Sequence, residues 1–257
     1  MIKIELGDFD YAKIIPLSDL HIGDPDFDEK ILLKYLKQAE EDNCFILLNG
    51  DMIEMATKDS VGDVYGQVLP PEKQYDKLGD LLTPYKHKIL VATEGNHEYR
   101  QYKNTGLSSK RFYASLNIPF YPDEAWLKIT VGRKKKNNKP VAYSVYMIHG
   151  HGGGRRTGSK ANRLEDLGNG RFADLFIRSH THWQMVFPDT YEMPNMYADR
   201  IRKVPRLFVN TGCFVGSRYA IRHEYKKSTL GTPLIYLNGR EKRIKAEVSV
   251  EAVYEKR

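Results

Sequence analysis

The chain has 257 residues, 41% of them hydrophobic and 28% charged, and a net charge of +7, which is typical of a globular protein and excludes a disordered chain. It has only two cysteines, no run of about 18 apolar residues and no apolar core of a signal peptide at its N-terminus. We therefore expect a cytoplasmic protein that needs no disulfide framework and no membrane, with residues 1–257 folded as a single domain.

The first predicted unit is a strand, a helix and a second strand. Residues 13–18 form a short apolar run that ends at Asp19, and residues 44–49 form another that leads to Asp51. Between them, residues 27–42 carry apolar side chains at the spacing of an amphipathic helix. This order predicts two parallel strands joined by a right-handed helical crossover.

The next part of the chain predicts a third strand of the same kind. Residues 59–71 are rich in Gly, Asp and Pro and predict a loop, and a helix is expected over residues 75–85. The apolar residues 88–93 then predict a strand that leads to the segment 95–98. A short helix is expected over residues 108–116.

The second half of the chain predicts mainly strands. Residues 125–131 and 141–148 alternate between apolar and polar side chains, and the basic segment between them predicts a hairpin turn. Four more strands are expected, at residues 174–178, 206–209, 234–237 and 246–253.

Side chains of the types that bind metals recur at the ends of these strands. They lie in six short segments, Asp19-Leu20-His21, Gly50-Asp51, Gly95-Asn96-His97-Glu98, His149-Gly150-His151, His180-Thr181-His182 and Asn210-Thr211-Gly212. One such segment alone would more often be a polar turn or a surface pair. Because α/β sheets place their sites at the carboxyl ends of strands, we expect the segments to converge on one metal centre.

The order of the segments, D-x-H, G-D, G-N-H-[DE], H and H-x-H, resembles that of the calcineurin-type metallophosphoesterase family. The resemblance covers most of residues 12–216. It implies an α/β fold (α+β in some schemes) with four α-β-β-α layers, in which two mixed sheets are flanked by helices and the metals lie at strand ends. It also implies an enzyme that hydrolyses phosphate esters by means of a hydroxide bridging two metals.

The resemblance further implies which residues bind the metals. One metal takes Asp19, His21 and His182, Asp51 bridges both metals, and Asn96, His149 and His180 complete the second site. Mixed oxygen and imidazole ligands favour two divalent transition metals, with Mn preferred over Fe, Zn, Co or Ni. His151 is either an alternative to His149 as the ligand or a residue that supports the ligands. Strand geometry gives an argument that is independent of the resemblance. Alternate side chains of an extended chain point the same way, so Asp19 and His21 could reach one metal.

Two more residues are expected to take part in catalysis. In the family, the histidine after the asparagine faces the leaving group, and here that residue is His97. When protonated, it would donate to the leaving oxygen. Glu98, where the family usually has aspartate, is expected to orient His97 through a ring nitrogen.

The charge distribution bears on the substrate. Residues 100–163 contain 14 Lys and Arg against 2 Asp and Glu, which indicates either a rim that attracts a polyanion or a solvated basic surface. Arg100, Arg155 and Arg156 lie near the motifs and are expected to bind phosphate oxygens. These features favour a phosphodiesterase acting on nucleotides, DNA or RNA. A phosphomonoesterase for nucleotides or phosphoproteins is the alternative, and a non-catalytic scaffold with this fold is a remote one.

Overall fold

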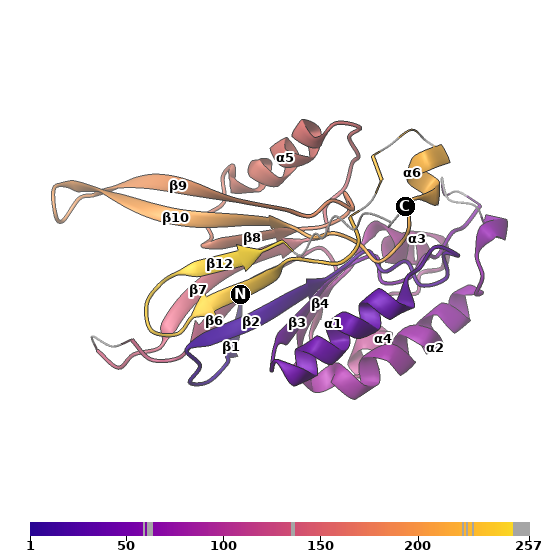
Figure 1. The fold of residues 1–257 in the computed structure, drawn as a ribbon, viewed down its shortest axis with the longest axis horizontal. Coiled ribbons are helices and arrows are strands. Elements are labelled where there is room, and N and C mark those ends of the chain that lie inside the picture. The colour runs from indigo at the N-terminus through magenta and orange to yellow at the C-terminus, as the bar shows by residue number, and fades with distance from the viewer. Residues whose placement is uncertain are drawn as a thin grey trace, which may run out of the picture.

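Two mixed sheets of six strands each pack face to face in the described part of the chain (Figure 1). The structure, a computed structural model, describes residues 1–58, 60, 64–134, 137–222, 224, 226–227 and 229–248. Sheet A has the order β1 (Ile2–Glu5), β6 (Glu124–Val131), β7 (Val141–Ile148), β8 (Leu175–Arg178), β10 (Arg200–Asn210) and β9 (Met185–Asn195). Sheet B has the order β12 (Ile244–Glu247), β11 (Leu234–Asn238), β2 (Tyr11–Leu17), β3 (Phe45–Asn49), β4 (Ile89–Thr93) and β5 (Phe120–Tyr121).

Helices cover the outer faces of both sheets. The outer face of sheet B carries α1 (Glu29–Glu41), α2 (Pro71–Leu82) and α4 (Lys110–Ser115), whereas α5 (Thr157–Glu165) lies on sheet A (Figure 1). Leu32, Leu36 and Ala39 of α1 recur at helical spacing and are fully buried, so one stripe of this helix packs on sheet B. In the same way, Leu164 of α5 packs with Phe176 of sheet A.

The core between the sheets explains why the strands alternate. Along β6, every second residue from Ala125 to Val131 is buried and joins the apolar layer between the sheets. In β2, Ile14 faces this layer, whereas Ile15 and Leu17 pack with the helices on the other side of sheet B. The four layers therefore follow helix, sheet, sheet and helix, and the predicted fold class is confirmed.

The long hairpin of β9 and β10 is the largest feature that the sequence did not predict. The two strands pair antiparallel along their whole length, from Met185 opposite Asn210 to Asn195 opposite Arg200. The hairpin projects beyond the body of the molecule, and Tyr197 at its tip is fully exposed (Figure 1). The predicted strand over residues 206–209 is therefore only the inner end of β10.

Other boundaries differ by small amounts from the predictions. The strand expected over residues 246–253 begins earlier, as β12, and its last five positions lie outside the described residues. The loop expected over residues 59–71 is described only in part and contains a short 3₁₀ turn, Val64–Gly66. In the described part of the chain, six α-helices or strands had no prediction: β1, β5, β9, α3 (Asn96–Thr105), α5 and α6 (Arg218–Arg222).

The lengths and apolar content of the described helices bear on membrane insertion. In the described ranges, none is both long enough and apolar enough to cross a bilayer.

Candidate metal centre

The strand ends bring the predicted segments together at one edge of the two sheets. β2, β3 and β4 run parallel and end just before Asp19, Asp51 and Asn96. In sheet A, β7 and β8 also run parallel and end just before His149 and His180. The centre is therefore assembled from both sheets.

Five of the predicted ligands lie in left-handed backbone conformation. The φ angles are 51° at Asp19, 52° at His21, 53° at Asp51, 73° at His180 and 52° at His182. This conformation is uncommon for residues other than glycine, and Asp and His are among those that tolerate it best. The extended chain expected from Asp19 to His21 is therefore wrong, because the backbone turns at both positions. Such strain concentrates at functional sites, where surrounding structure holds it in place.

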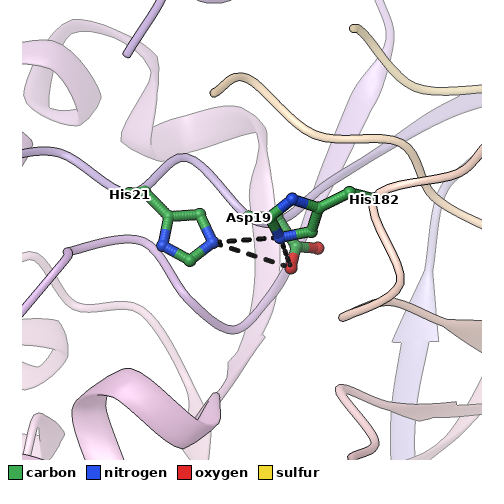
Figure 2. A group of neighbouring side chains, drawn as sticks. All are labelled: Asp19, His21 and His182. Carbon is green, nitrogen blue, oxygen red and sulfur yellow. Dashed lines mark hydrogen bonds and ion pairs between the residues drawn. The ribbon is translucent and has the colours of Figure 1, made fainter. Parts of the chain in front are cut away.

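Asp19, His21 and His182 form the first cluster of donor atoms (Figure 2). Nε2 of His182 lies 3.2 Å from Oδ1 of Asp19 and 3.1 Å from Nε2 of His21. Nε2 of His21 is 4.0 Å from the same Asp19 oxygen. These three atoms therefore face one small space, although the residues are up to 163 positions apart in the chain.

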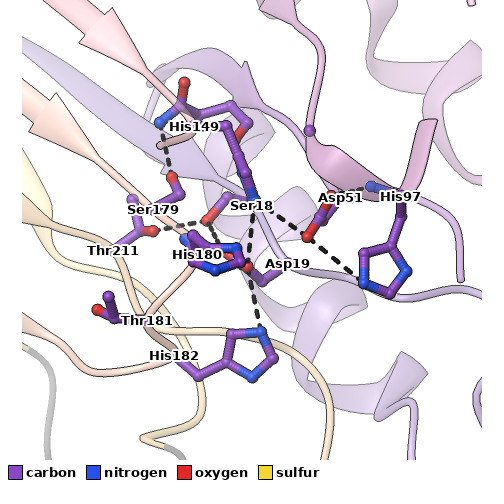
Figure 3. Close-up of polar contacts among 12 residues, drawn as sticks. Ser18, Asp19, Asp51, His97, His149, Ser179, His180, Thr181, His182 and Thr211 are labelled. Carbon is purple, nitrogen blue, oxygen red and sulfur yellow. Dashed lines mark hydrogen bonds and ion pairs between the residues drawn. The ribbon is translucent and has the colours of Figure 1, made fainter. Parts of the chain in front are cut away.

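Asp51, His149 and His180 form the second cluster (Figure 3). Oδ2 of Asp51 lies 3.0 Å from Nε2 of His149 and 4.0 Å from Nε2 of His21, so it reaches both clusters. Its Oδ1 accepts a hydrogen bond from the backbone N–H of His97 at 2.9 Å. The carboxylate of Asp51 is thus fixed at the boundary between the clusters.

Several of these donor atoms are buried without a partner. Oδ1 of Asn96 and Nδ1 of His180 are inaccessible and have no hydrogen-bond partner among the described residues, while Oδ1 of Asp19 and Nε2 of His149 have only the ion-pair contacts within the clusters. Buried polar atoms are normally paired, so a group of unpaired ones points to an ion or water that satisfies them. Since all four are oxygen or imidazole donors, the residues present fit divalent transition metals.

The ligands are oriented by groups behind them. Nδ1 of His149 lies 2.7 Å from the backbone carbonyl oxygen of Asn49, which leaves its Nε2 free to face the centre. The Ser18 hydroxyl donates to Oδ2 of Asp19 at 2.7 Å and lies 2.6 Å from the hydroxyl of Thr211 (Figure 3). The segment that begins at Asn210 therefore supports the centre through Ser18.

Close packing at the centre requires glycine at two positions. A Cβ atom on Gly95 would lie 2.1 Å from Oδ1 of Asp51, and one on Gly50 would lie 2.6 Å from the backbone nitrogen of Gly95. Gly50 also has a φ of 80°. Both glycines are therefore needed for the loops after β3 and β4 to approach each other.

Glu54 takes the place that was expected of Glu98. Nδ1 of His97 hydrogen-bonds to the backbone carbonyl oxygen of Glu54 and lies 3.4 Å from the Glu54 carboxylate. The same carboxylate lies 2.8 Å from Nδ1 of His21. Glu54 therefore orients both a predicted metal ligand and the predicted proton donor. Nothing in the sequence distinguishes it from an ordinary turn residue after Asp51.

Glu98 instead hydrogen-bonds to the backbone of the two loops that follow β3 and β4. Its Oε2 accepts the backbone N–H groups of Asp51 at 2.9 Å and Gly95 at 3.0 Å, and its Oε1 accepts that of Met52 at 2.6 Å. The side chain is buried at the start of α3. The prediction that Glu98 orients His97 is therefore wrong, because the backbone occupies its carboxylate.

Opposite charges set the ionisation of the centre. Burial opposes the charge on Asp19, but His149 and His182 lower the pKa of this carboxyl to about 2. Burial also opposes the charge on Asp51, whose pKa is held well below its usual range by His149 and His97. For His180, burial and the charge of His149 lower the pKa to about 3. Both carboxylates are therefore charged at neutral pH and attract cations.

A cleft of about 360 Å³ opens onto both clusters. Arg100, which was expected to bind phosphate oxygens, lines the cleft and donates to the backbone carbonyl oxygen of Met55 at 3.3 Å. Arg155 and Arg156 are exposed outside the lining of the cleft, as is His151, whereas His149 is buried in the second cluster. Of the described Lys and Arg residues over residues 100–163, only Arg100 and Lys160 line the cleft.

The basic turn between β6 and β7 lies away from the centre. Because β7 runs toward His149, its first residue and the turn before it are at the opposite end of sheet A (Figure 1). Residues 135–136 of this turn lie outside the described residues. The expectation of a basic rim is therefore wrong for this turn. One lysine that the sequence did not single out, Lys226, lines the cleft instead.

The sequence and the fold were compared with known proteins. Residues 12–187 match the family model described as calcineurin-like phosphoesterase. No curated protein gives a significant match. Among solved structures, the phosphoesterase Yfce from E. coli matches with a TM-score of 0.43 and 14% identity, over 93% of this chain and 100% of that one. The calcineurin-like phosphoesterase YfkN from Bacillus subtilis matches with a TM-score of 0.40 and 13% identity, over 92% and 90% of the two chains. Because the family model spans more than half of the sequence, the chain belongs to the calcineurin-like phosphoesterase family and is a metal-dependent hydrolase.

Proposed function

We propose that this chain is a phosphodiesterase that uses two metals and acts on nucleotides or nucleic acid. The observation that carries the proposal is the position of Asp51, whose Oδ2 lies within 4.0 Å of a histidine nitrogen of each cluster. A shared carboxylate lets two cations sit close together, as two-metal phosphoesterases require. The cations that line the cleft, Arg100, Lys160 and Lys226, support a substrate with more than one phosphate.

The proposed ligand sets follow the two clusters. Asp19, His21 and His182 would hold one metal, Asn96, His149 and His180 the other, with Asp51 shared. Mn is the metal we propose, with Fe, Zn, Co and Ni as alternatives. When bound, the metals would supply a nucleophile at neutral pH and polarise the phosphate.

His97 is proposed to protonate the leaving oxygen. Its Nδ1 is held by Glu54, so its Nε2 faces the cleft, 3.8 Å from Oδ2 of Asp51. Burial lowers the pKa of His97, which makes its imidazolium a stronger acid toward the developing alkoxide but confines this protonated form to lower pH. Arg100 lies one helical turn further along α3 and lines the same part of the cleft, where it would bind the leaving group.

Replacing Glu54 by alanine is expected to lower turnover by about 10–100-fold, because residues that orient metal ligands have effects of this size. Loss of the 2.8 Å contact to His21 should also raise the metal concentration that gives half-maximal activity. The measurement is kcat as a function of added Mn. Glu72→Ala, which removes an exposed carboxylate on α2, is the control. An unchanged metal dependence and unchanged kcat would contradict the orienting role.

The proposed function is tested with metal-stripped protein reconstituted with Mn. We expect hydrolysis of bis-p-nitrophenyl phosphate and of single- or double-stranded DNA, abolished by EDTA. Hydrolysis of p-nitrophenyl phosphate alone would move the assignment to a phosphomonoesterase. Metal binding without turnover of any phosphoester would favour a scaffold.

We also propose that residues 1–257 form a single domain that works in the cytoplasm. The apolar layer between the sheets supports the first point, since it draws on strands from Ile2 to Ala246. The second is supported by Cys44 and Cys213, which are buried, free thiols suited to a reducing compartment.

A further inference from the structure

Two lysines meet at one tryptophan on the wall of the cleft. Nζ of Lys160 lies 5.3 Å from the centre of the Trp183 ring, and Nζ of Lys226 lies 5.2 Å from it. Both lysines line the cleft, although 66 positions separate them in the chain. The ring therefore keeps the two ammonium groups near each other, through cation–π contacts.

In the described part of the chain, neither ammonium group is paired with a carboxylate. Lys160 is only 8% exposed and donates to the backbone carbonyl oxygen of Thr181 at 2.9 Å. Lys226 donates to the hydroxyl of Thr157 at 2.7 Å. Within the described ranges, no carboxylate lies within ion-pair distance of either lysine. An ammonium group has three donors, so each lysine has donors left for an anion. A cation as buried as Lys160 normally has a partner.

The position of Lys160 places this anion beside the metal centre. Thr181, which fixes Lys160, lies between His180 of the second cluster and His182 of the first. An anion held by the lysines would therefore lie close to a phosphate at the clusters. Asp24 also lines the cleft and would repel a phosphate, whereas the lysines would attract one.

We infer that Lys160 and Lys226, joined by Trp183, form a subsite for the phosphate next to the one that is cleaved. This inference rests on the proposed function and specifies its substrate as a nucleotide chain with at least two phosphates. Each lysine contributes a charge-assisted hydrogen bond to a phosphate oxygen, and such bonds are strong where water is partly excluded.

The test compares substrates that differ only in a second phosphate. dTpdT carries only the phosphodiester to be cleaved, whereas pdTpdT and dTpdTp carry one more phosphate, at the 5′ or the 3′ end. We expect Lys226→Met to lower kcat/KM by about tenfold for pdTpdT or dTpdTp, with less than about a twofold change for dTpdT. Lys226 is the position of choice because its side chain is exposed and its loss should not disturb folding. Equal changes for all three substrates, or none, would overturn the subsite.

A matched control is provided by the neighbouring residue. Lys227 is exposed and does not line the cleft, so Lys227→Met should leave all three rates unchanged. A loss with Lys227→Met as large as with Lys226→Met would show a general effect of charge and would refute a specific subsite.

A binding measurement separates the subsite from the proposed function. The chain has two tryptophans, so in the Trp126→Phe variant all tryptophan fluorescence comes from Trp183. Because both lysines lie against the Trp183 ring, this fluorescence should respond when an anion binds them. Titration with pdTpdT should change this emission, with about tenfold weaker binding once Lys226→Met is added. If no diester is cleaved, the proposed function fails, while this titration still decides the subsite. An unchanged emission, or equal affinities, would refute it.

Discussion

Asp51→Asn is expected to reduce the occupancy of both metals and to lower turnover by more than about a hundredfold. The carboxylate lies between the clusters, and an amide in its place offers them a neutral oxygen where a charged one is needed. Substitution of a residue that only orients metal ligands already lowers activity or metal affinity by about 10–100-fold, so loss of the shared ligand should lower turnover further. The measurement is elemental analysis of the purified variant together with its kcat.

Two outcomes for Asp51→Asn would contradict the shared role of this residue. Full occupancy of both metals in the variant would exclude a shared ligand, and loss of only one metal would place Asp51 at a single site. Asp80→Asn, which changes an exposed aspartate on α2, should keep both the metal content and the turnover of the wild type. Circular dichroism of both variants shows whether folding is intact.

His97→Ala is expected to lower kcat by about 10²–10⁴-fold while the metal content stays nearly intact. The reason is that Nδ1 of His97 is held by Glu54, and we propose that its Nε2 donates to the leaving oxygen and binds no metal. A substrate with a good leaving group, such as p-nitrophenolate, needs less protonation. The loss of kcat should therefore be smaller for bis-p-nitrophenyl phosphate than for dTpdT. A larger loss on dTpdT would identify His97 as a proton donor.

Equal losses of metal and of turnover in His97→Ala would show that His97 is a ligand. An equal loss of kcat on both substrates would show that it acts by some means other than protonation. His151→Ala is the matched control, because His151 is exposed and lies outside the cleft lining. Its kinetics should equal those of the wild type.

The sequence predicted the parts of the centre that follow buried strands. The apolar runs before Asp19, Asp51 and His149 have a strong local pattern, and parallel pairing then brings their ends together. The order of the motifs, which resembles that of the family, also implied which histidines belong to the same metal. This is why the fold class and the residues of both clusters could be named before the structure was considered.

Other parts of the site depend on contacts that no local pattern contains. The orienting role of Glu54 arises only because the backbone turns at Asp51 and brings Glu54 against His21 and His97. Lys160 and Lys226 meet at Trp183 although they are distant in sequence. Long-range packing decides such contacts.

The missed elements have physical reasons as well. Helix α3 buries only Glu98, so it shows no apolar stripe at helical spacing. The outer half of the hairpin of β9 and β10 is mostly exposed and carries Pro194, which weakens the strand pattern. The sequence signal for an element thus fades where the element contributes little to a core.

The left-handed backbone at five ligand positions has a consequence for engineering this enzyme. Each such residue costs about 1–3 kcal/mol, and glycine adopts the same conformation without steric cost. Selection for thermal stability alone would therefore favour glycine at Asp19, His21, Asp51, His180 and His182. Stabilising substitutions at these five positions would then coincide with the loss of catalysis. A thermostable library should hold these five codons constant and vary the rest.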